Sequence, residues 1–222
     1  MAFEASYPRR KTVPCRVGPV TIGAGHPVVV QSMVTEETRN VDAVVEQIIA
    51  LHREGCEIVR VTTPSLNDAR ICQEIAAKVR ERYQYVPLTA DVHHQGSDIA
   101  VEAAKWVDEV RLNPGLFVFK RHGTRSDKQG MGQVDVRGRE ETEIDRLRNE
   151  LAYDPVEWGE EVAAIEESLI PVIETCKRFD RGMRIGVNHG SLSERMLVTY
   201  GDTPEGMVQS ALEYLRLCEK HG

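Results

Sequence analysis

Three arginines of this chain interrupt short apolar runs and could bind an anion together. Arg60, Arg111 and Arg184 are each flanked by valine, isoleucine, leucine or methionine, as in a strand. An arginine in such a strand is costly unless it is paired or directed at a ligand. Because each guanidinium can bind two oxygens in one plane, three converging arginines would suit the oxygens of a phosphate or diphosphate. The alternative for each arginine alone is a buried ion pair with a carboxylate.

Polar residues follow two of these arginines near the predicted strand ends. Asn113 lies two residues after the second arginine and Asn188 lies four residues after the third, so strand alternation places each asparagine on the face of its arginine. His189 and Ser191 come next, in a glycine-containing loop whose backbone amides could bind phosphate. The sequence therefore predicts a site for a small, highly anionic molecule.

Two other groups could join this site. Asp91 and His93 share one face at the end of another predicted strand, where a carboxylate and an imidazole could transfer protons or bind a metal. They could equally orient loop amides or contact the ligand directly. Gln31 and Ser32 close the first apolar run and could supply neutral hydrogen bonds, with loop capping as the alternative.

Strands and helices alternate along the chain after a predicted hairpin at 13–22. Apolar runs, typical of strands buried on both faces, predict strands at 27–32, 58–62, 86–92, 109–113 and 184–188. Helical periodicity predicts helices at 41–54, 66–83, 98–105, 155–178 and 204–219, the first ending before Gly55 and the last opening on Thr203-Pro204. Ligand-type residues at successive strand ends favour a TIM-type (β/α) barrel over an open doubly wound sheet. No G-x-G-x-x-G follows a strand, so a dinucleotide fold has no support.

The predicted barrel is incomplete. About five strand–helix units are visible, whereas a closed barrel requires eight. We expect either a portion of a longer protein or an open sheet whose edge is covered. The predicted organisation is an N-terminal tail at 1–12 and a partial barrel at 13–222, with a charged inserted excursion at about 120–152.

Composition excludes several classes of protein. The chain has 222 residues, 41% of them apolar, which is enough for one domain with a core. A net charge of −7 argues against general binding to nucleic acid or a membrane surface, and no run approaches the roughly 20 apolar residues of a membrane span. The five cysteines form no C-x-x-C pair, so the residues support neither a disulfide framework nor a local zinc or iron–sulfur site. We expect Cys56 and Cys72 to be buried free thiols, and the protein to be cytoplasmic.

One charged pair is expected to be structural. Glu194 and Arg195 should be solvated or locally paired, with ligand contact as the alternative.

Five motifs occur in order and resemble one enzyme family, 4-hydroxy-3-methylbut-2-enyl diphosphate synthase of the methylerythritol phosphate route to isoprenoids. The similarity runs from about residue 10 to 219, apart from the excursion. The motifs are Val30-Gln-Ser-Met33, Ile58-Val-Arg-Val-Thr62, Ala90-Asp-Val-His93, Val110-Arg-Leu-Asn-Pro-Gly115 and Met183-Arg-Ile-Gly-Val-Asn-His-Gly-Ser-Leu192.

The resemblance implies a barrel that binds 2-C-methyl-D-erythritol 2,4-cyclodiphosphate. The family opens this ring reductively with two electrons, which a [4Fe-4S] cluster delivers and ferredoxin or flavodoxin donates. The family's diphosphate clamp would correspond to Arg60, Arg111 and Arg184, and its cavity lining to Asn113, Asn188, Asp91 and His93.

The chain also departs from the family. The cluster ligands, three cysteines and a glutamate in a separate C-terminal domain, have no counterpart here, and a strand with a Ser-x-Lys phosphate contact is absent. The resemblance therefore implies that this chain alone binds no cluster and catalyses nothing, and that the full-length protein is a homodimer. Two alternatives are a non-catalytic phosphosugar-binding domain and a pteroate-synthase-like barrel enzyme, although the Lys-and-Asp pterin pocket of the latter is not evident.

Overall fold

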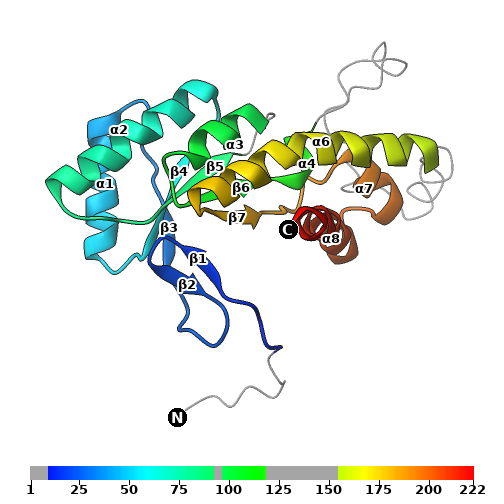
Figure 1. Cartoon of the computed structure of the whole chain (residues 1–222), viewed down its shortest axis with the longest axis horizontal. Coiled ribbons are helices and arrows are strands. Elements are labelled where there is room, and N and C mark those ends of the chain that lie inside the picture. Colours follow the sequence, from blue (N-terminus) through cyan, green and yellow to red (C-terminus); the bar gives the residue numbers. More distant parts are fainter. Residues whose placement is uncertain (1–9, 93–96, 119–154) are drawn as a thin grey trace.

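The computed structural model describes residues 10–92, 97–118 and 155–222, and in it five parallel strands form one sheet. The strands follow one another across the sheet in chain order (Figure 1). They are β3 (Gln31–Met33), β4 (Ile58–Thr62), β5 (Leu88–Val92), β6 (Glu109–Leu112) and β7 (Gly182–Ile185). The predicted parallel α/β fold is confirmed.

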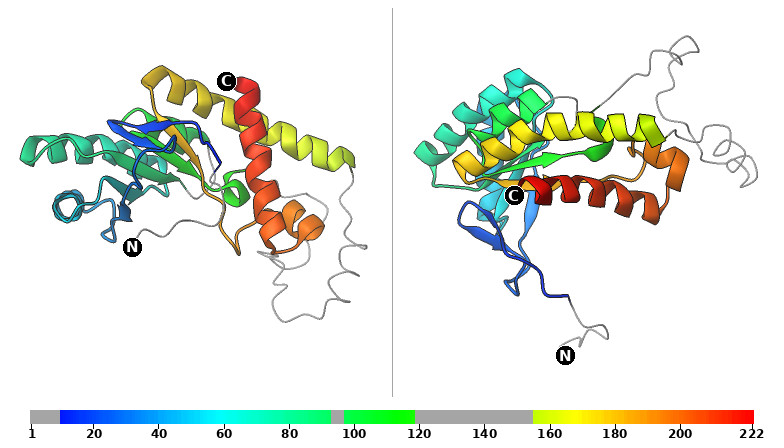
Figure 2. Two further views of the ribbon diagram at one scale, coloured as in Figure 1. Left: turned by 90° about the horizontal axis from the view of Figure 1, so that it is seen from below. Right: turned by 45° about the vertical axis from the view of Figure 1, so that its right-hand side comes forward.

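Helices cover one face of this sheet. Contacts join α1 to β4, α2 to β5, α3 to β5 and β6, and α6 to β7. A second group packs together beside α6, with α8 touching α4, α6 and α7 (Figure 2). Within the described residues, every helix is too short or too polar to span a lipid bilayer. The helices are α1 (Val41–Arg53), α2 (Leu66–Arg82), α3 (Ser97–Ala104), α4 (Pro114–Phe117), α6 (Pro155–Phe179), α7 (Glu194–Tyr200) and α8 (Pro204–His221).

Alternate strand residues face the helices and form the core. Val59 and Val61 on β4, Ala90 on β5, and Val110 and Leu112 on β6 are all buried. They belong to one apolar cluster with side chains from α1, α2, α3 and α6. Because side chains alternate along a strand, the residues between them point to the opposite face. That face carries the arginines.

Two helix ends follow the sequence closely. Gly55 directly follows the last residues of α1 and has a φ of +94°, a conformation that favours glycine. The Thr203 hydroxyl accepts a hydrogen bond from the Gly206 amide at 3.1 Å, with Pro204 as the first residue of α8. The predicted start of α8 is confirmed, while the C-cap of α1 is Glu54, one residue before the predicted Gly55.

The predicted hairpin packs at the amino-terminal end of the sheet. Its strands are β1 (Cys15–Val17) and β2 (Val20–Ile22), which pair antiparallel. Val17 is fully buried, and Arg16 pairs with Asp180 at 2.5 Å just before β7. A Cβ atom at Gly182 would lie 3.1 Å from the Arg16 carbonyl oxygen. The hairpin thus lies far from the strand ends where ligands are expected.

The first predicted strand is shorter and less buried than expected. The sequence predicts a strand at 27–32 with both faces buried, but β3 begins only at Gln31, and Val28 and Val30 are 86% and 53% exposed. The ladder with β4 begins where Gln31 meets Ile58, and just before it the Val30 carbonyl accepts from the Glu57 and Ile58 amides. Among the five strands of the sheet, β3 is an edge strand, while β5 and β6 are buried along their whole length.

The last strand also ends earlier than predicted. The sequence predicts a strand at 184–188, whereas β7 covers Gly182–Ile185 and Asn188 lies in the following loop. Its neighbour β6 stops at Leu112 because Asn113 caps the short helix α4, so β7 has no pairing partner further along. Helices α4 and α7 were not predicted. The predicted excursion at about 120–152, and most of the tail at 1–12, lie outside the described residues.

Arg195 is buried rather than solvated, and its partners are distant in sequence. Its side chain donates to both oxygens of Glu213, at 2.5 and 2.7 Å, and to Glu161 at 3.1 Å. The guanidinium also lies 4.3 Å from the centre of the Trp158 ring. The expectation of a solvated or locally paired set is therefore wrong for Arg195, which joins α6, α7 and α8.

We expect Arg195→Met to lower the free energy of unfolding by about 3–5 kcal/mol, because it leaves two poorly exposed carboxylates without their cation. Urea titration followed by circular dichroism measures this change. The control is Lys220→Ala, which removes an exposed lysine from its pair with Glu166 and should cost at most about 1 kcal/mol. Equal losses in the two variants would contradict the structural role of Arg195.

Candidate anion-binding site

Strand register brings the polar residues into two adjacent rows on the face opposite the helices. In the upper row, nearer the carboxyl ends of the strands, Thr62, Asp91, Arg111 and Arg184 lie side by side on β4, β5, β6 and β7. In the lower row the neighbours are Met33, Arg60, Thr89, Glu109 and Gly182. Residues in register on parallel strands point to the same side of the sheet. All three predicted arginines therefore share one face.

Asp91 lies between two of these arginines. Its Oδ1 accepts from Arg111 Nη1 at 2.9 Å, and its Oδ2 lies 3.5 Å from Arg60 Nε. The side chains of Asp91 and Arg111 are only 7% and 6% exposed. The buried ion pair proposed as the alternative is thus present for Arg111, and it exists within the convergent cluster. One carboxylate neutralises part of the charge of two cations.

Arg111 is also held from the next strand. Its Nη2 donates to the Gly186 carbonyl oxygen at 2.5 Å. The Asn188 side-chain amide lies 3.0 Å from the same nitrogen, and its oxygen accepts in the orientation that satisfies both amide atoms. A Cβ atom at Gly186 would lie 2.0 Å from Arg111 Nε, so only glycine leaves room for the guanidinium. Arg111 is fixed from three directions.

The loop after β7 rests on the start of α4. The Asn113 amide nitrogen donates to Ser191 Oγ at 3.1 Å, while its oxygen accepts from the Gly115 amide. A Cβ atom at Gly115 would lie 1.7 Å from the Ser191 carbonyl oxygen. Asn113 and Ser191 therefore meet as the sequence predicted for one site. In this structure they hold two loops together.

The third arginine has a different kind of support. Arg184 is exposed, and its Nη1 donates to Gln31 Oε1 at 2.5 Å. Gln31 Nε2 lies 3.3 Å from Thr89 Oγ1, which donates to Glu109 Oε2 at 2.8 Å. Sequence reasoning missed Thr89 and Glu109. The available signal was alternation, because Glu109, Arg111 and Asn113 occupy successive positions of one strand face.

Glu109 is a buried acid beneath the arginines. Burial raises the pKa of its carboxyl, and the hydrogen bonds from Thr89 and Gln31 and the positive charges of Arg184 and Arg60 oppose this shift. The raised pKa means that the folded protein disfavours the ionised form. The arginine cluster does not fully offset the cost of burying that charge.

Two predicted residues are not brought into the cluster, and a third is outside it for another reason. Ser32 is in register with Val59, so its side chain points toward the helices, and its amide donates to Cys56 Sγ. His189 is 66% exposed and lies 3.3 Å from Asp202. Alternation along β3 places the Ser32 and Gln31 side chains on opposite faces of the sheet. His189 lies in the loop because β7 ends at Ile185. His93 lies outside the described residues.

The described residues do not fit an iron–sulfur cluster. In the described ranges no three His, Cys, Asp or Glu side chains gather closely enough to hold a metal ion. Cys56 and Cys72 are buried free thiols, as predicted, and burial raises the pKa of Cys72 to about 12. The same cause raises the pKa of Cys176 to about 12. Clusters bind thiolates, and the raised pKa values of Cys72 and Cys176 favour their protonated thiols.

Residues 12–222 match the GcpE TIM-barrel domain. The chain belongs to the GcpE family. The TIM-type fold predicted from the sequence is therefore confirmed, and the five parallel strands of the described residues are part of such a barrel. TIM-barrel enzymes place their active sites at the carboxyl ends of the strands, and the upper row of polar residues lies nearer to that end.

Relatives of this GcpE-family chain carry the enzyme name that the motifs suggested. Proteins named 4-hydroxy-3-methylbut-2-en-1-yl diphosphate synthase (ferredoxin) are 51% identical in Gloeothece citriformis and 50% identical in Synechocystis sp., each over 217 residues. A third, from Trichormus variabilis, is 48% identical over 217 residues. Each alignment covers 98% of this chain but only 47–48% of the relative. The chain spans about half the length of the curated relatives it matches.

We expect Gly186→Ala to lower the free energy of unfolding by about 1–3 kcal/mol, since its Cβ atom would displace the Arg111 guanidinium from its buried partners. The control is Gly159→Ala on α6, where a Cβ atom meets nothing within 4 Å. Alanine in a helix should make that variant about 0.5–1 kcal/mol more stable. Urea unfolding of both variants is the measurement, and a neutral Gly186→Ala would show that Arg111 has space to move.

The raised pKa of Glu109 predicts a pH dependence of stability. A folded-state pKa above the ordinary 4.5 means that the folded protein holds its proton longer than the unfolded chain. Stability from this group is complete below pH 4.5 and is lost as the pH rises through the folded pKa. We therefore expect the unfolding free energy of the unchanged protein, relative to Glu109→Gln, to fall over that window and then level off. A difference that stays constant with pH would contradict the assignment.

Proposed function

We propose that this chain is the substrate-binding barrel of a reductive synthase of isoprenoid biosynthesis. The reaction converts 2-C-methyl-D-erythritol 2,4-cyclodiphosphate to 4-hydroxy-3-methylbut-2-enyl diphosphate. The observation that carries the proposal is the position of three arginines on one face of a parallel sheet, two of them in the row nearer the carboxyl ends of its strands. The relatives' name, a diphosphate synthase, fits a site built for a diphosphate. It also favours this enzyme over a pteroate-synthase-like barrel.

The three arginines would contribute differently to diphosphate binding. Arg111 is buried, and its two terminal nitrogens already donate to Asp91 and Gly186. Arg60 is 26% exposed and Arg184 is exposed, so these two have nitrogens that can reach phosphate oxygens. Arg111 would then fix the shape and charge of the site, while Arg60 and Arg184 contact the ligand. Bidentate contact suits the planar guanidinium.

The electrons for the reaction would come from outside the described residues. In the full-length protein a [4Fe-4S] cluster would deliver two electrons to the substrate carbon. The relatives' name specifies ferredoxin, so we propose ferredoxin rather than flavodoxin as the donor. We also propose a homodimer for the full-length protein. A reducing cytoplasm suits the five cysteines, all of which are free thiols.

We expect Arg184→Ala to weaken binding of the cyclodiphosphate at least tenfold with little change in stability, since a charged hydrogen bond contributes about 1.5–3 kcal/mol. Arg111→Ala should also weaken cyclodiphosphate binding at least tenfold, and in addition should lower the free energy of unfolding, because it removes the closer of the two arginines beside the buried Asp91 carboxylate. Isothermal titration calorimetry gives the affinities and urea titration the stabilities.

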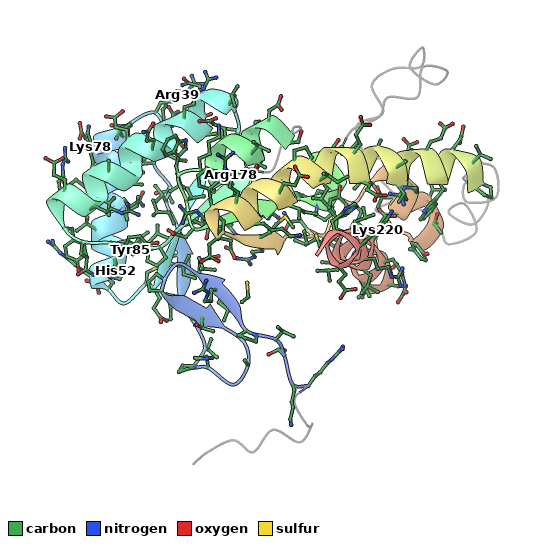
Figure 3. All side chains as sticks on the ribbon, in the orientation of Figure 1. Arg39, His52, Lys78, Tyr85, Arg178 and Lys220 are labelled. Atoms are coloured by element: carbon green, nitrogen blue, oxygen red, sulfur yellow. The ribbon has the colours of Figure 1, made fainter. Side chains whose placement is uncertain are left out.

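A matched control is Arg178→Ala, which removes an arginine from α6 (Figure 3). The Arg178 guanidinium lies 5.5 Å from the centre of the Phe179 ring. Its affinity for the cyclodiphosphate should stay within about twofold of the unchanged chain. A loss of cyclodiphosphate affinity below tenfold for both Arg111→Ala and Arg184→Ala would count against diphosphate binding by the arginines. Tight binding without turnover in the full-length protein would favour the non-catalytic phosphosugar-binding alternative.

A further inference from the structure

A directional chain of hydrogen bonds runs from the exposed edge of the arginine cluster to a buried carboxyl. Arg184 donates to Gln31, Gln31 donates to Thr89, and Thr89 donates to Glu109. Every donor points toward Glu109, which accepts at the end. Thr89 is 0% exposed and Glu109 is 4% exposed, so water does not replace these partners. The chain crosses four strands, β7, β3, β5 and β6.

The direction of this chain fixes how Gln31 presents its amide. A glutamine side chain can present either its oxygen or its nitrogen to a neighbour. Because the Thr89 proton is given to Glu109, the Thr89 oxygen is left to accept, and Gln31 must turn its nitrogen toward it. The Gln31 oxygen then faces Arg184. With the opposite orientation, an amide nitrogen would face the guanidinium and no bond could form.

Arg184 needs such support more than the other two arginines. It is the exposed member of the cluster, and fixing an exposed arginine in one conformation costs side-chain entropy that grows with the number of rotatable bonds. Arg60 and Arg111 each have Asp91 beside them. The partner of Arg184 is the neutral amide of Gln31, whose own position depends on Thr89 and Glu109.

We propose that Thr89 and Glu109 are positioning residues for anion binding, which act through Gln31 to hold the Arg184 guanidinium in its binding conformation. This inference rests on the proposed function, because it takes the cyclodiphosphate as the anion. Neither residue would touch the ligand. Their effect on affinity should therefore exist only while Arg184 is present, which separates positioning from a general loss of structure.

Electrostatics alone would give a different pattern. Glu109 faces the Arg60 and Arg184 charges, the Thr89 hydroxyl and the Gln31 amide, and it lies near the Cys15 thiol of β1. A purely electrostatic carboxylate would weaken anion binding, so its removal would strengthen it. A positioning residue gives the opposite sign. Thr89 carries no charge, so a substitution at this position tests positioning without changing the electrostatic field of the site.

The test is a double-mutant cycle in the full 222-residue chain, with cyclodiphosphate affinity measured by isothermal titration calorimetry. Thr89→Val keeps the shape of the side chain but cannot donate, and it should weaken binding roughly three- to tenfold, the value of one neutral hydrogen bond. Thr89→Ser retains the hydroxyl and should stay within about twofold of the unchanged chain. In the Arg184→Ala background, Thr89→Val should have no further effect.

The outcomes separate the inference from the proposed function. Equal weakening by Thr89→Val with and without Arg184, or no weakening in either background, would overturn the positioning role. Absence of cyclodiphosphate binding by the unchanged chain, or an Arg184→Ala variant that binds normally, would instead overturn the proposed site. Glu109→Leu provides a second test of the positioning role. Weaker cyclodiphosphate binding by this variant supports positioning through Gln31, and stronger binding supports a purely electrostatic effect of the carboxylate. Melting curves identify any variant that fails to fold, and the Thr89→Ser and Thr89→Val pair then decides the question.

Discussion

The site depends on one shared carboxylate. Three guanidinium groups on one face of a sheet would repel one another and would be costly to remove from water. Asp91 reduces both costs for Arg60 and Arg111 because it lies between them, within 3.5 Å of one and 2.9 Å of the other. Neutralisation is incomplete, since the three arginines share two carboxylates, Asp91 and the buried Glu109, whose ionised form is disfavoured. In the proposed site, the positive charge that remains would attract an anion.

The sheet can hold this charge only because its two faces are so different. The valine, alanine and leucine side chains of β4, β5 and β6 form the apolar core with the helices, and that burial supplies the main stabilisation. Because side chains alternate along a strand, the residues between these core positions, most of which are polar, lie on the opposite face of the sheet. Close register between β5, β6 and β7 sets Asp91, Arg111 and Arg184 side by side. Glycine at 186 leaves the space that the central guanidinium fills.

The sequence could predict which face of the sheet each side chain lies on, because side chains alternate along a strand. It could not predict which residues of neighbouring strands are in register. The convergence of the arginines, and the meeting of Asn113 with Ser191, required only strand parity and the shared end of parallel strands. Alternation places Glu109 on the face of Arg111, but its partnership with Thr89 comes from register between β5 and β6, which no local pattern reveals. Ser32 was predicted to belong to the site because it ends an apolar run. Alternation along β3, however, places its side chain on the face that the helices cover. Arg195 was misjudged because its partners are 34 and 18 residues away.

The arginines of the cluster differ in burial and in hydrogen-bond partners. The change from the buried Arg111 to the exposed Arg184 suggests how an anion would bind. Arg111 is the most buried of the three, and its acceptors are a carboxylate and a carbonyl oxygen. Arg184 is exposed, and its described acceptor is a neutral amide. A phosphate oxygen that displaced the partners of Arg111 would separate the buried Asp91 carboxylate from its closer arginine, whereas Arg184 can add a ligand while keeping Gln31. An anion would therefore bind from the Arg184 side and complete the set of charges, and the internal ion pair at Asp91 would remain intact.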